Sequence, residues 1–313
     1  MAPTSETPAA LSSPATPPPQ QRPSFLAQPS TPRFGLPPGA CDTHVHVFGP
    51  AARFPFADSR PYTPADAPKE ALFALHRQMG IERCVIVQSG IHGFDNSAAE
   101  DAIAAQHGNY VGIALLPLTV PDAELHRLDA AGFRGVRFNY MHHLGSAPPI
   151  ADVIAFARRL EPIGWHLQIH PDPGLIAELA PSLRASPVPV VIDHMGRVDA
   201  GLGLDQPAFV ALRVLLGDPK IHVKVSGSER SSRLGPPYRD AVPIAQALVD
   251  AFPAQVLWGT DWPHPNVPGG PPDDGLLVDL IAEMAPAAVQ RQALLVDNPA
   301  RLYRFTDTRA AGA

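Results

Sequence analysis

The feature that most constrains the fold is an alternation of short apolar runs with helix-like stretches, which begins after Pro38-Gly39. Eight apolar, β-prone runs follow one another: Ala40–Val47, Cys84–Gln88, Val111–Leu116, Gly135–Asn139, His166–His170, Val188–Asp193, His222–Ser226 and Val256–Thr260. Seven helix-like stretches lie between them and an eighth follows the last run: Ala67–Met79, Ala98–Gln106, Ala123–Ala131, Ala151–Ile163, Pro173–Leu183, Pro207–Leu216, Tyr238–Phe252 and Ala287–Leu295. Eight strand–helix units predict an α/β fold whose parallel sheet closes into a (β/α)8 TIM barrel.

Two further properties favour the closed barrel. The runs are almost continuously apolar, as expected of parallel strands that are covered on both faces. The chain has 313 residues, which fits one barrel of about 250 residues with additions. A doubly wound open sheet is the alternative, and it ranks second because no glycine-rich phosphate-binding turn follows the first run.

The composition divides the chain into three parts. Residues 1–36 are rich in Pro, Ser, Thr, Ala and Gln, which predicts a disordered tail because such a segment buries little apolar area. Residues 37–307 form the predicted barrel, and residues 308–313 a flexible C-terminus.

Composition and charge exclude several classes of protein. Hydrophobic residues make up 45% of the chain and charged residues 17%, which is typical of a globular protein. The net charge of −6 does not suit a nucleic-acid binder. Cys41 and Cys84 form no CxxC motif, no apolar run approaches a membrane span, and the N-terminus lacks the pattern of a secretory signal. We therefore expect a cytoplasmic protein with reduced thiols and without a membrane partner, and the sequence does not predict its oligomeric state.

Histidine and aspartate stand at the ends of four predicted strands, where barrel enzymes place their chemistry. His44 and His46 are two residues apart, so both side chains project to the same side of the first strand, and we expect both to point into the barrel mouth, where they could share one ligand. His170 ends the fifth strand, His194 follows the sixth, and Asp261 follows the eighth. Any one of these residues alone is more often structural, but imidazoles and a carboxylate together make a plausible Zn²⁺ site with a position left for water.

Longer segments carry a resemblance to a known family. They are residues 38–50 (PGACDTHVHVFGP), 85–88 (VIVQ), 92–93, 95–96, 134–139 (RGVRFN), 164–166, 191–197 (VIDHMGR), 258–266 (WGTDWPHPN) and 298–303 (NPARLY). In these segments the chain resembles the amidohydrolase superfamily, in the branch that contains 2-pyrone-4,6-dicarboxylate hydrolase. The resemblance implies a barrel of the metal-dependent-hydrolase type and a lactonase of aromatic-acid catabolism, with Asp261 as the general base.

The fifth strand departs from the pyrone hydrolase, which has a tyrosine where this chain has His170. Because metal-binding amidohydrolases carry histidine there, the resemblance implies one zinc ion held by His44, His46, His170 and Asp261. His194 would then lie near the substrate carbonyl or act as a further ligand. Arg137 stands where binuclear members carry a bridging lysine, which argues against a second ion. The alternative is a site without metal, in which His170 hydrogen-bonds the substrate.

Arginine suits an anionic substrate because its planar guanidinium pairs bidentately with a carboxylate or sulfonate. Arg137 and Arg230 match arginines of the pyrone hydrolase, whereas His143 replaces a third. Tyr62 and His92 correspond to substrate-contacting positions, although both could equally be packing or loop residues.

The two departures from the pyrone hydrolase, at His170 and His143, favour a small anionic lactone of the 4-sulfomuconolactone or muconolactone kind as the substrate, as in the zinc-dependent relatives of the branch. Asp261 would deprotonate water, His194 would act at the substrate carbonyl, and the arginines would orient the anionic groups. The alternatives are a metal-free 2-pyrone-4,6-dicarboxylate lactonase, an amidohydrolase-type decarboxylase, and a barrel without activity that serves as a binding protein.

Overall fold

The computed structural model describes residues 24–60, 62–144, 147–267 and 269–305, and these residues form the expected barrel. Its eight parallel strands lie in the order of the sequence: β1 (Cys41–Val45), β2 (Arg83–Val87), β3 (Tyr110–Ala114), β4 (Phe133–Tyr140), β5 (His166–Pro171), β6 (Val190–Ile192), β7 (Ile221–Val225) and β8 (Val256–Trp258). The (β/α)8 prediction is confirmed, since each of the eight predicted runs contains or overlaps one strand.

The last strand returns to the first. Asp261 N–H donates to the His44 carbonyl at 2.8 Å, and His46 N–H donates to the Trp262 carbonyl at 2.7 Å. Gly259 permits this approach, because a Cβ at that position would lie 2.7 Å from the His44 nitrogen. The residues that close the barrel are therefore the same ones that carry the candidate chemistry.

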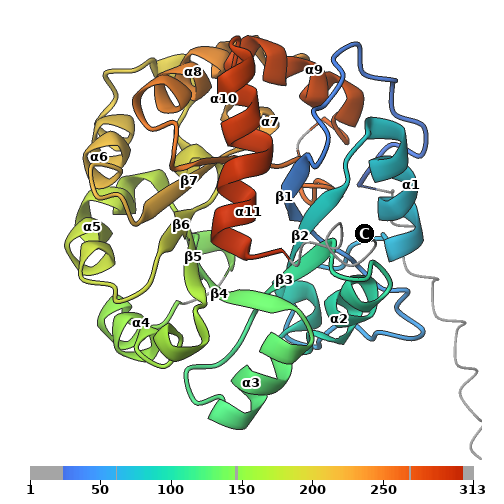
Figure 1. Ribbon diagram of the computed structural model, residues 1–313, viewed down its shortest axis with the longest axis vertical. Helices are drawn as coiled ribbons and strands as arrows, with labels where there is room; N and C mark the ends of the chain where they lie inside the picture. Colours follow the sequence, from blue (N-terminus) through green and yellow to red (C-terminus); the bar gives the residue numbers. More distant parts are fainter. Residues whose placement is uncertain (1–23, 61, 145–146, 268, 306–313) are drawn as a thin grey trace, which may run out of the picture.

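Helices surround the sheet and also cover one of its ends (Figure 1). The α-helices are α1 (Lys69–Met79), α2 (Ser97–Ala104), α3 (Asp122–Ala130), α4 (Ile150–Ala157), α5 (Ile176–Arg184), α6 (Pro207–Leu215), α7 (Ser228–Ser231), α8 (Val242–Ala251), α9 (Asp274–Met284), α10 (Ala288–Gln292) and α11 (Asn298–Tyr303). Short helical turns are η1 (Gly90–His92), η2 (His142–Leu144), η3 (Glu161–Ile163), η4 (Pro173–Leu175), η5 (His194–Arg197), η6 (Ala200–Leu202), η7 (Arg239–Ala241) and the π-helical η8 (Ala293–Asp297).

The sequence prediction missed the one-turn helix α7 as well as α9 and α11. Helix α9 begins at a cap in which Asp273 accepts a hydrogen bond from the Gly275 amide, as expected for aspartate at a helix N-terminus. Helix α11 carries Tyr303, which packs with Cys41, Val85 and Leu257 inside the strands. In Figure 1 this helix crosses in front of the sheet, so the opposite end of the barrel is the one that remains for a site.

Residues 24–36 belong to the stretch that the sequence assigns to a loose tail, yet they lie against the barrel. Asp279 of α9 accepts hydrogen bonds from the Arg33 and Phe34 amides, at 2.6 and 2.9 Å. Phe25 packs on Trp262 with their ring centroids 4.9 Å apart. The tail prediction can therefore apply only to residues 1–23, which lie outside the described residues, as does the predicted flexible C-terminus.

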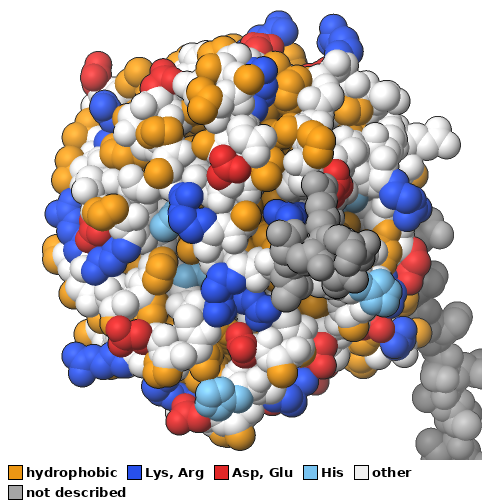
Figure 2. All heavy atoms as spheres, viewed as in Figure 1, with side chains coloured by type: hydrophobic (Ala, Val, Ile, Leu, Met, Phe, Trp, Pro, Cys, Tyr) orange, Lys and Arg blue, Asp and Glu red, His pale blue; other side chains and the backbone are white. Residues whose placement is uncertain are grey.

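The barrel interior has two chemically different sides. Val85, Val111, Ile113 and Leu257 fill it beside β2, β3 and β8. Beside β4 to β7 buried polar groups predominate, at Arg137, Gln168, Asp193 and Lys224, although Val191 of β6 joins the apolar cluster. Outside the strands, a large apolar core fills the space beneath the helices. On the outer face shown in Figure 2, basic and acidic side chains are interspersed. None of the helices in the described residues is long and apolar enough to cross a membrane.

Candidate active site

Three imidazoles converge on one carboxylate oxygen at the open end of the barrel. The Nε2 atoms of His44, His46 and His194 lie 3.6, 3.5 and 3.6 Å from Asp261 Oδ1. His44 and His46 come from the end of β1, His194 from the turn after β6, and Asp261 from the turn after β8. The predicted strand-end cluster is thus brought together in space.

Each imidazole is held at its other nitrogen. His46 Nδ1–H donates to the Val87 carbonyl at 2.7 Å, so the neutral ring has its lone pair on Nε2. Ser226 Oγ lies 3.0 Å from His194 Nδ1. Burial, with a contribution from Lys224, lowers the pKa of His44 to about 3, and burial also holds the pKa of His194 well below its ordinary value. These two rings are therefore neutral at physiological pH, as metal ligands must be.

The donor set fits a single metal ion. Two atoms that each lie about 2.1 Å from a tetrahedral ion are about 3.4 Å apart, close to the spacings found between the histidine nitrogens and Asp261. His44 Nε2 is buried and has no hydrogen-bond partner among the described residues. His44, His46 and Asp261 form one group that could hold an ion, and His44, Asp193 and His194 form a second.

The backbone is strained where these residues leave the strands. His194, Arg197 and Asp261 have φ angles of 49°, 59° and 67°, in the left-handed region that residues other than glycine rarely adopt. Strain of this kind is maintained only where surrounding contacts fix it, and it is common at functional sites. The positive φ angles direct these three side chains toward the same cavity.

Asp261 is ionised and paired. Burial opposes its ionisation, but Arg230 and the surrounding imidazoles hold its pKa well below the ordinary value. Arg230 Nε–H donates to Asp261 Oδ2 at 2.5 Å, and Arg230 Nη2 donates to the Pro265 carbonyl at 3.1 Å. One oxygen of Asp261 therefore faces the imidazoles while the other is fixed by arginine.

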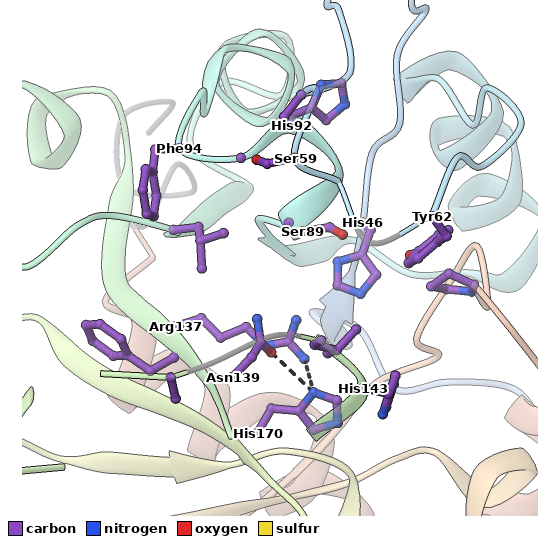
Figure 3. A pocket seen from close by; sticks show the side chains of 18 of the residues that line it. His46, Ser59, Tyr62, Ser89, His92, Phe94, Arg137, Asn139, His143 and His170 are labelled. Atoms are coloured by element: carbon purple, nitrogen blue, oxygen red, sulfur yellow. Dashed lines mark hydrogen bonds between the residues drawn. The ribbon is translucent and has the colours of Figure 1, made fainter. Parts of the chain in front are cut away.

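His170 lies beside this cluster but outside both groups that could hold an ion. Its ring centroid is 5.3 Å from that of His194. Arg137 Nη2 lies 2.9 Å from His170 Nδ1 (Figure 3). The same Nδ1 atom lies 3.3 Å from Asn139 Oδ1, but the contact with Arg137 is the shorter one; because a guanidinium can only donate, Nδ1 accepts this bond, and the neutral ring carries its proton on Nε2. That Nε2 atom is buried without a partner among the described residues.

Lys224 is a central residue that the sequence reasoning did not single out. Its side chain is fully buried, and Nζ donates to the Thr43 carbonyl at 2.8 Å and to Gln168 Oε1 at 2.9 Å. Nζ also lies 3.2 Å from His44 Nδ1. The available signal was a lysine between two valines in the run Ile221–Val225, because lysine is almost never buried without partners.

Arg197 was noted in the sequence only as part of a motif, yet it lines the same cavity as Arg137 and Arg230. Within the described part of the chain it makes no hydrogen bond or ion pair. Burial, and then the charge of Arg230, lower its pKa to about 10, so it remains a cation at neutral pH. Arg137 differs, because its Nε–H already donates to Asp193 Oδ2 at 2.9 Å.

The remaining predicted substrate residues also reach the cavity, in different ways. Tyr62 interacts with Ser89, and burial raises the pKa of Tyr62 to about 12, which keeps the phenol protonated. His143 is exposed at the rim. His92 has both nitrogens engaged by backbone, with Pro55 O at 3.1 Å and Gly49 N at 3.3 Å, which indicates that it braces a loop.

The cavity that unites these groups has a volume of about 600 Å³. Figure 3 shows His46, Arg137, Asn139 and His170 around its centre and Phe94 at its edge. Such a volume is within the usual range for small-molecule sites, roughly 300–1,000 Å³.

Comparison with known proteins agrees with this geometry. Residues 41–305 match the amidohydrolase family. The chain belongs to this family. It is 46% identical over 288 residues to a 2-pyrone-4,6-dicarboxylate hydrolase of Comamonas testosteroni, covering 89% of this chain and 94% of that protein. It is 40% identical over 291 residues to a 4-sulfomuconolactone hydrolase of Rhizobium radiobacter, covering 91% and 96%.

A solved structure shares the architecture of this amidohydrolase. It is a Pseudomonas putida protein assigned as a 2-pyrone-4,6-dicarboxylic acid hydrolase, with a TM-score of 0.76 and 32% identity, and the match covers 86% of this chain and 99% of that one. The predicted family and fold are confirmed. The individual roles of the site residues, including His170 as a ligand, remain predictions.

Proposed function

We propose that this amidohydrolase opens an anionic lactone of the 4-sulfomuconolactone or muconolactone kind by hydrolysis. The observation that carries the proposal is the set of three imidazoles around the ionised Asp261, in a cavity that also contains Arg137, Arg197 and Arg230. The similarity to two lactone hydrolases supports the reaction class.

The ion that suits this donor set is zinc, held by His44, His46 and Asp261, with His194 adjacent. When bound, zinc would polarise the lactone carbonyl and lower the pKa of a bound water. We assign His170 to the substrate rather than to the metal, because its Nε2 carries a proton and can donate to the carbonyl oxygen as negative charge develops there.

The reaction balances with water as the only co-reactant. Asp261 accepts a proton from the attacking water, whose oxygen bonds to the lactone carbonyl carbon. The bond between that carbon and the ring oxygen then breaks, and Asp261 returns the proton to the leaving oxygen. Arg137 and Arg230 orient the anionic groups, and the product is an open-chain acid.

A panel of muconolactone, 4-sulfomuconolactone and 2-pyrone-4,6-dicarboxylate, assayed with a pH indicator and with CO2 detection, tests the reaction. Hydrolysis acidifies the solution without releasing CO2, so CO2 release would indicate decarboxylation instead. Absence of turnover with all three compounds would contradict the proposal.

Metal analysis separates the two roles of His170. We expect His170→Tyr to retain zinc and to lose turnover, and His46→Ala to lose zinc. Loss of zinc from His170→Tyr would instead establish His170 as a ligand, as the sequence predicts. Absence of zinc from the wild-type protein, with turnover intact, would favour the metal-free mechanism.

A further inference from the structure

The cavity has two poles of opposite character. The polar groups of the candidate active site come from the ends of β1 and β4 to β8. The loops after β2 and β3 contribute mainly apolar or small residues, among them Phe94 and Leu115–Leu118, and no charged side chain among the lining residues described there. Because the strands are ordered consecutively around the barrel, these two loops form one continuous arc.

The polar pole contains a cation without a direct hydrogen-bond or ion-pair partner among the described residues, although the more distant Asp261, Glu229 and Asp172 favour its charge. This cation is Arg197, and the neighbouring Arg230 raises the positive charge beside it. His143 lies close enough that burial, followed by the charge of Arg197, lowers its pKa. A half-buried guanidinium without a partner is costly unless an anion binds there.

The apolar pole is partly exposed to solvent. Phe94 is 58% exposed although it stands at the cavity wall, and Leu118 is half-buried. Figure 3 places Phe94 across the cavity from Tyr62 and His143. A single-ring diacid held at the arginines would leave this arc in contact with water, whereas an apolar substituent would cover it.

We propose that the natural substrate is an amphipathic lactone, whose acidic group pairs with Arg197 and Arg230 and whose apolar alkyl or aryl substituent lies against Phe94 and Leu118. This inference rests on the proposed lactone hydrolysis and specifies the substrate class for the same site. The cavity of about 600 Å³ offers room for such a substituent beside the reacting ring.

The first test is a series of muconolactones that carry hydrogen, methyl, propyl or pentyl on the ring. Each methylene buried in the apolar arc should raise kcat/KM about fourfold, until the arc is filled. Phe94→Ala should lower the ratio of kcat/KM between the pentyl and unsubstituted lactones by about tenfold. Leu234→Ala is the matched control, because Leu234 is 78% exposed and does not line the cavity.

The second test compares each acid with its methyl ester. Arg197→Met should lower kcat/KM for the acid about 10- to 100-fold and change it for the ester about twofold at most. Arg213→Met is the matched control, since Arg213 is exposed on α6 and lies outside the cavity lining. An equal effect of Arg197→Met on kcat/KM for the acid and for the ester would show a structural role, and it would overturn the proposed pairing of the acidic group with Arg197.

The outcomes distinguish the substrate class from the reaction. Turnover that does not depend on chain length would overturn the amphipathic substrate and leave the lactonase intact. If no lactone is hydrolysed, the affinity of the ring-opened acids, measured by calorimetry, still tests whether the ligand is amphipathic. An affinity that rises with chain length and falls in Phe94→Ala would support the amphipathic ligand. An affinity independent of chain length would overturn it.

Discussion

Replacing Lys224 with methionine tests whether the buried polar side of the interior holds the site in place. Methionine has a similar length but no donor, so the Thr43 carbonyl and Gln168 Oε1, at 2.8 and 2.9 Å from Nζ, would lose their hydrogen bonds. Asp193 would lose a cation 3.6 Å away but would keep Arg137 at 2.9 Å.

Each buried acceptor left unsatisfied costs about 1–3 kcal/mol, and removing one partner of a buried charge pair costs about 3–5 kcal/mol. Burial lowers the pKa of Lys224 to about 8, which shows that the buried lysine itself is costly, and methionine removes that cost. We therefore expect a net loss near the lower limit, about 3 kcal/mol of unfolding free energy.

Urea unfolding followed by circular dichroism measures this loss, and the midpoint should fall by up to about 1 M, because the dependence of unfolding free energy on urea is steep for a protein of this size. Lys220→Met is the matched control: Lys220 is half-buried and its Nζ donates to the Ser186 carbonyl at 2.9 Å, so its replacement should cost no more than about 1 kcal/mol. Equal unfolding free energies for the two variants would refute the reasoning.

Three further predictions concern catalysis, pH and the N-terminal segment. Asp261→Asn should lower kcat about 10²- to 10⁴-fold in the indicator assay, with the circular dichroism spectrum unchanged, because the amide cannot accept the proton. Burial lowers the pKa of His222 to about 4 in the folded protein, so the unfolded chain binds more protons, and His222 should contribute about 3 kcal/mol to the stability lost as the pH drops from about 6.5 to 4, beside the other buried histidines with lowered pKa values. His222→Gln should reduce the loss of stability measured by urea unfolding over that pH range by about the His222 contribution, and an unchanged profile would contradict the assignment. Asp279→Ala removes the acceptor of the Arg33 and Phe34 amides, so trypsin should cleave after Arg33 faster than in the wild type.

The sequence predicts the strands well because parallel strands in a closed barrel are apolar on both sides, and the pattern is therefore local. It also predicts that His44 and His46 both point into the barrel mouth, but not the backbone feature that turns them there. Cys41 already faces the interior, so simple alternation along β1 would direct both histidines outward. A register shift between Asp42 and Val45 reverses that alternation, and Val45 joins the outer core instead. Such a bulge depends on pairing with β2, which no local pattern encodes.

Lys224 and Arg197 were missed for different reasons. The pattern of β7 contains the lysine, but only the tertiary structure shows that Thr43, Gln168 and His44 surround it. Arg197 reaches the cavity because the backbone after β6 takes positive φ angles at successive residues, which sequence patterns do not predict for non-glycine residues. Helix α9 was missed because its approach is rich in proline and glycine, which suggested a loop.

On the polar side of the barrel interior, the same residues stabilise the fold and position the imidazoles of the candidate site. On the apolar side, the residues stabilise the fold only. Beside β4 to β7, Asp193 lies between Arg137 and Lys224, and these cations in turn contact His170 and His44. Buried charges of this kind add little net stability, but they fix directions, because every hydrogen bond has a preferred geometry. Substitutions there should change turnover and stability together. Substitutions of Val111 or Leu257 on the apolar side should change stability through packing and leave the orientation of the imidazoles unaltered.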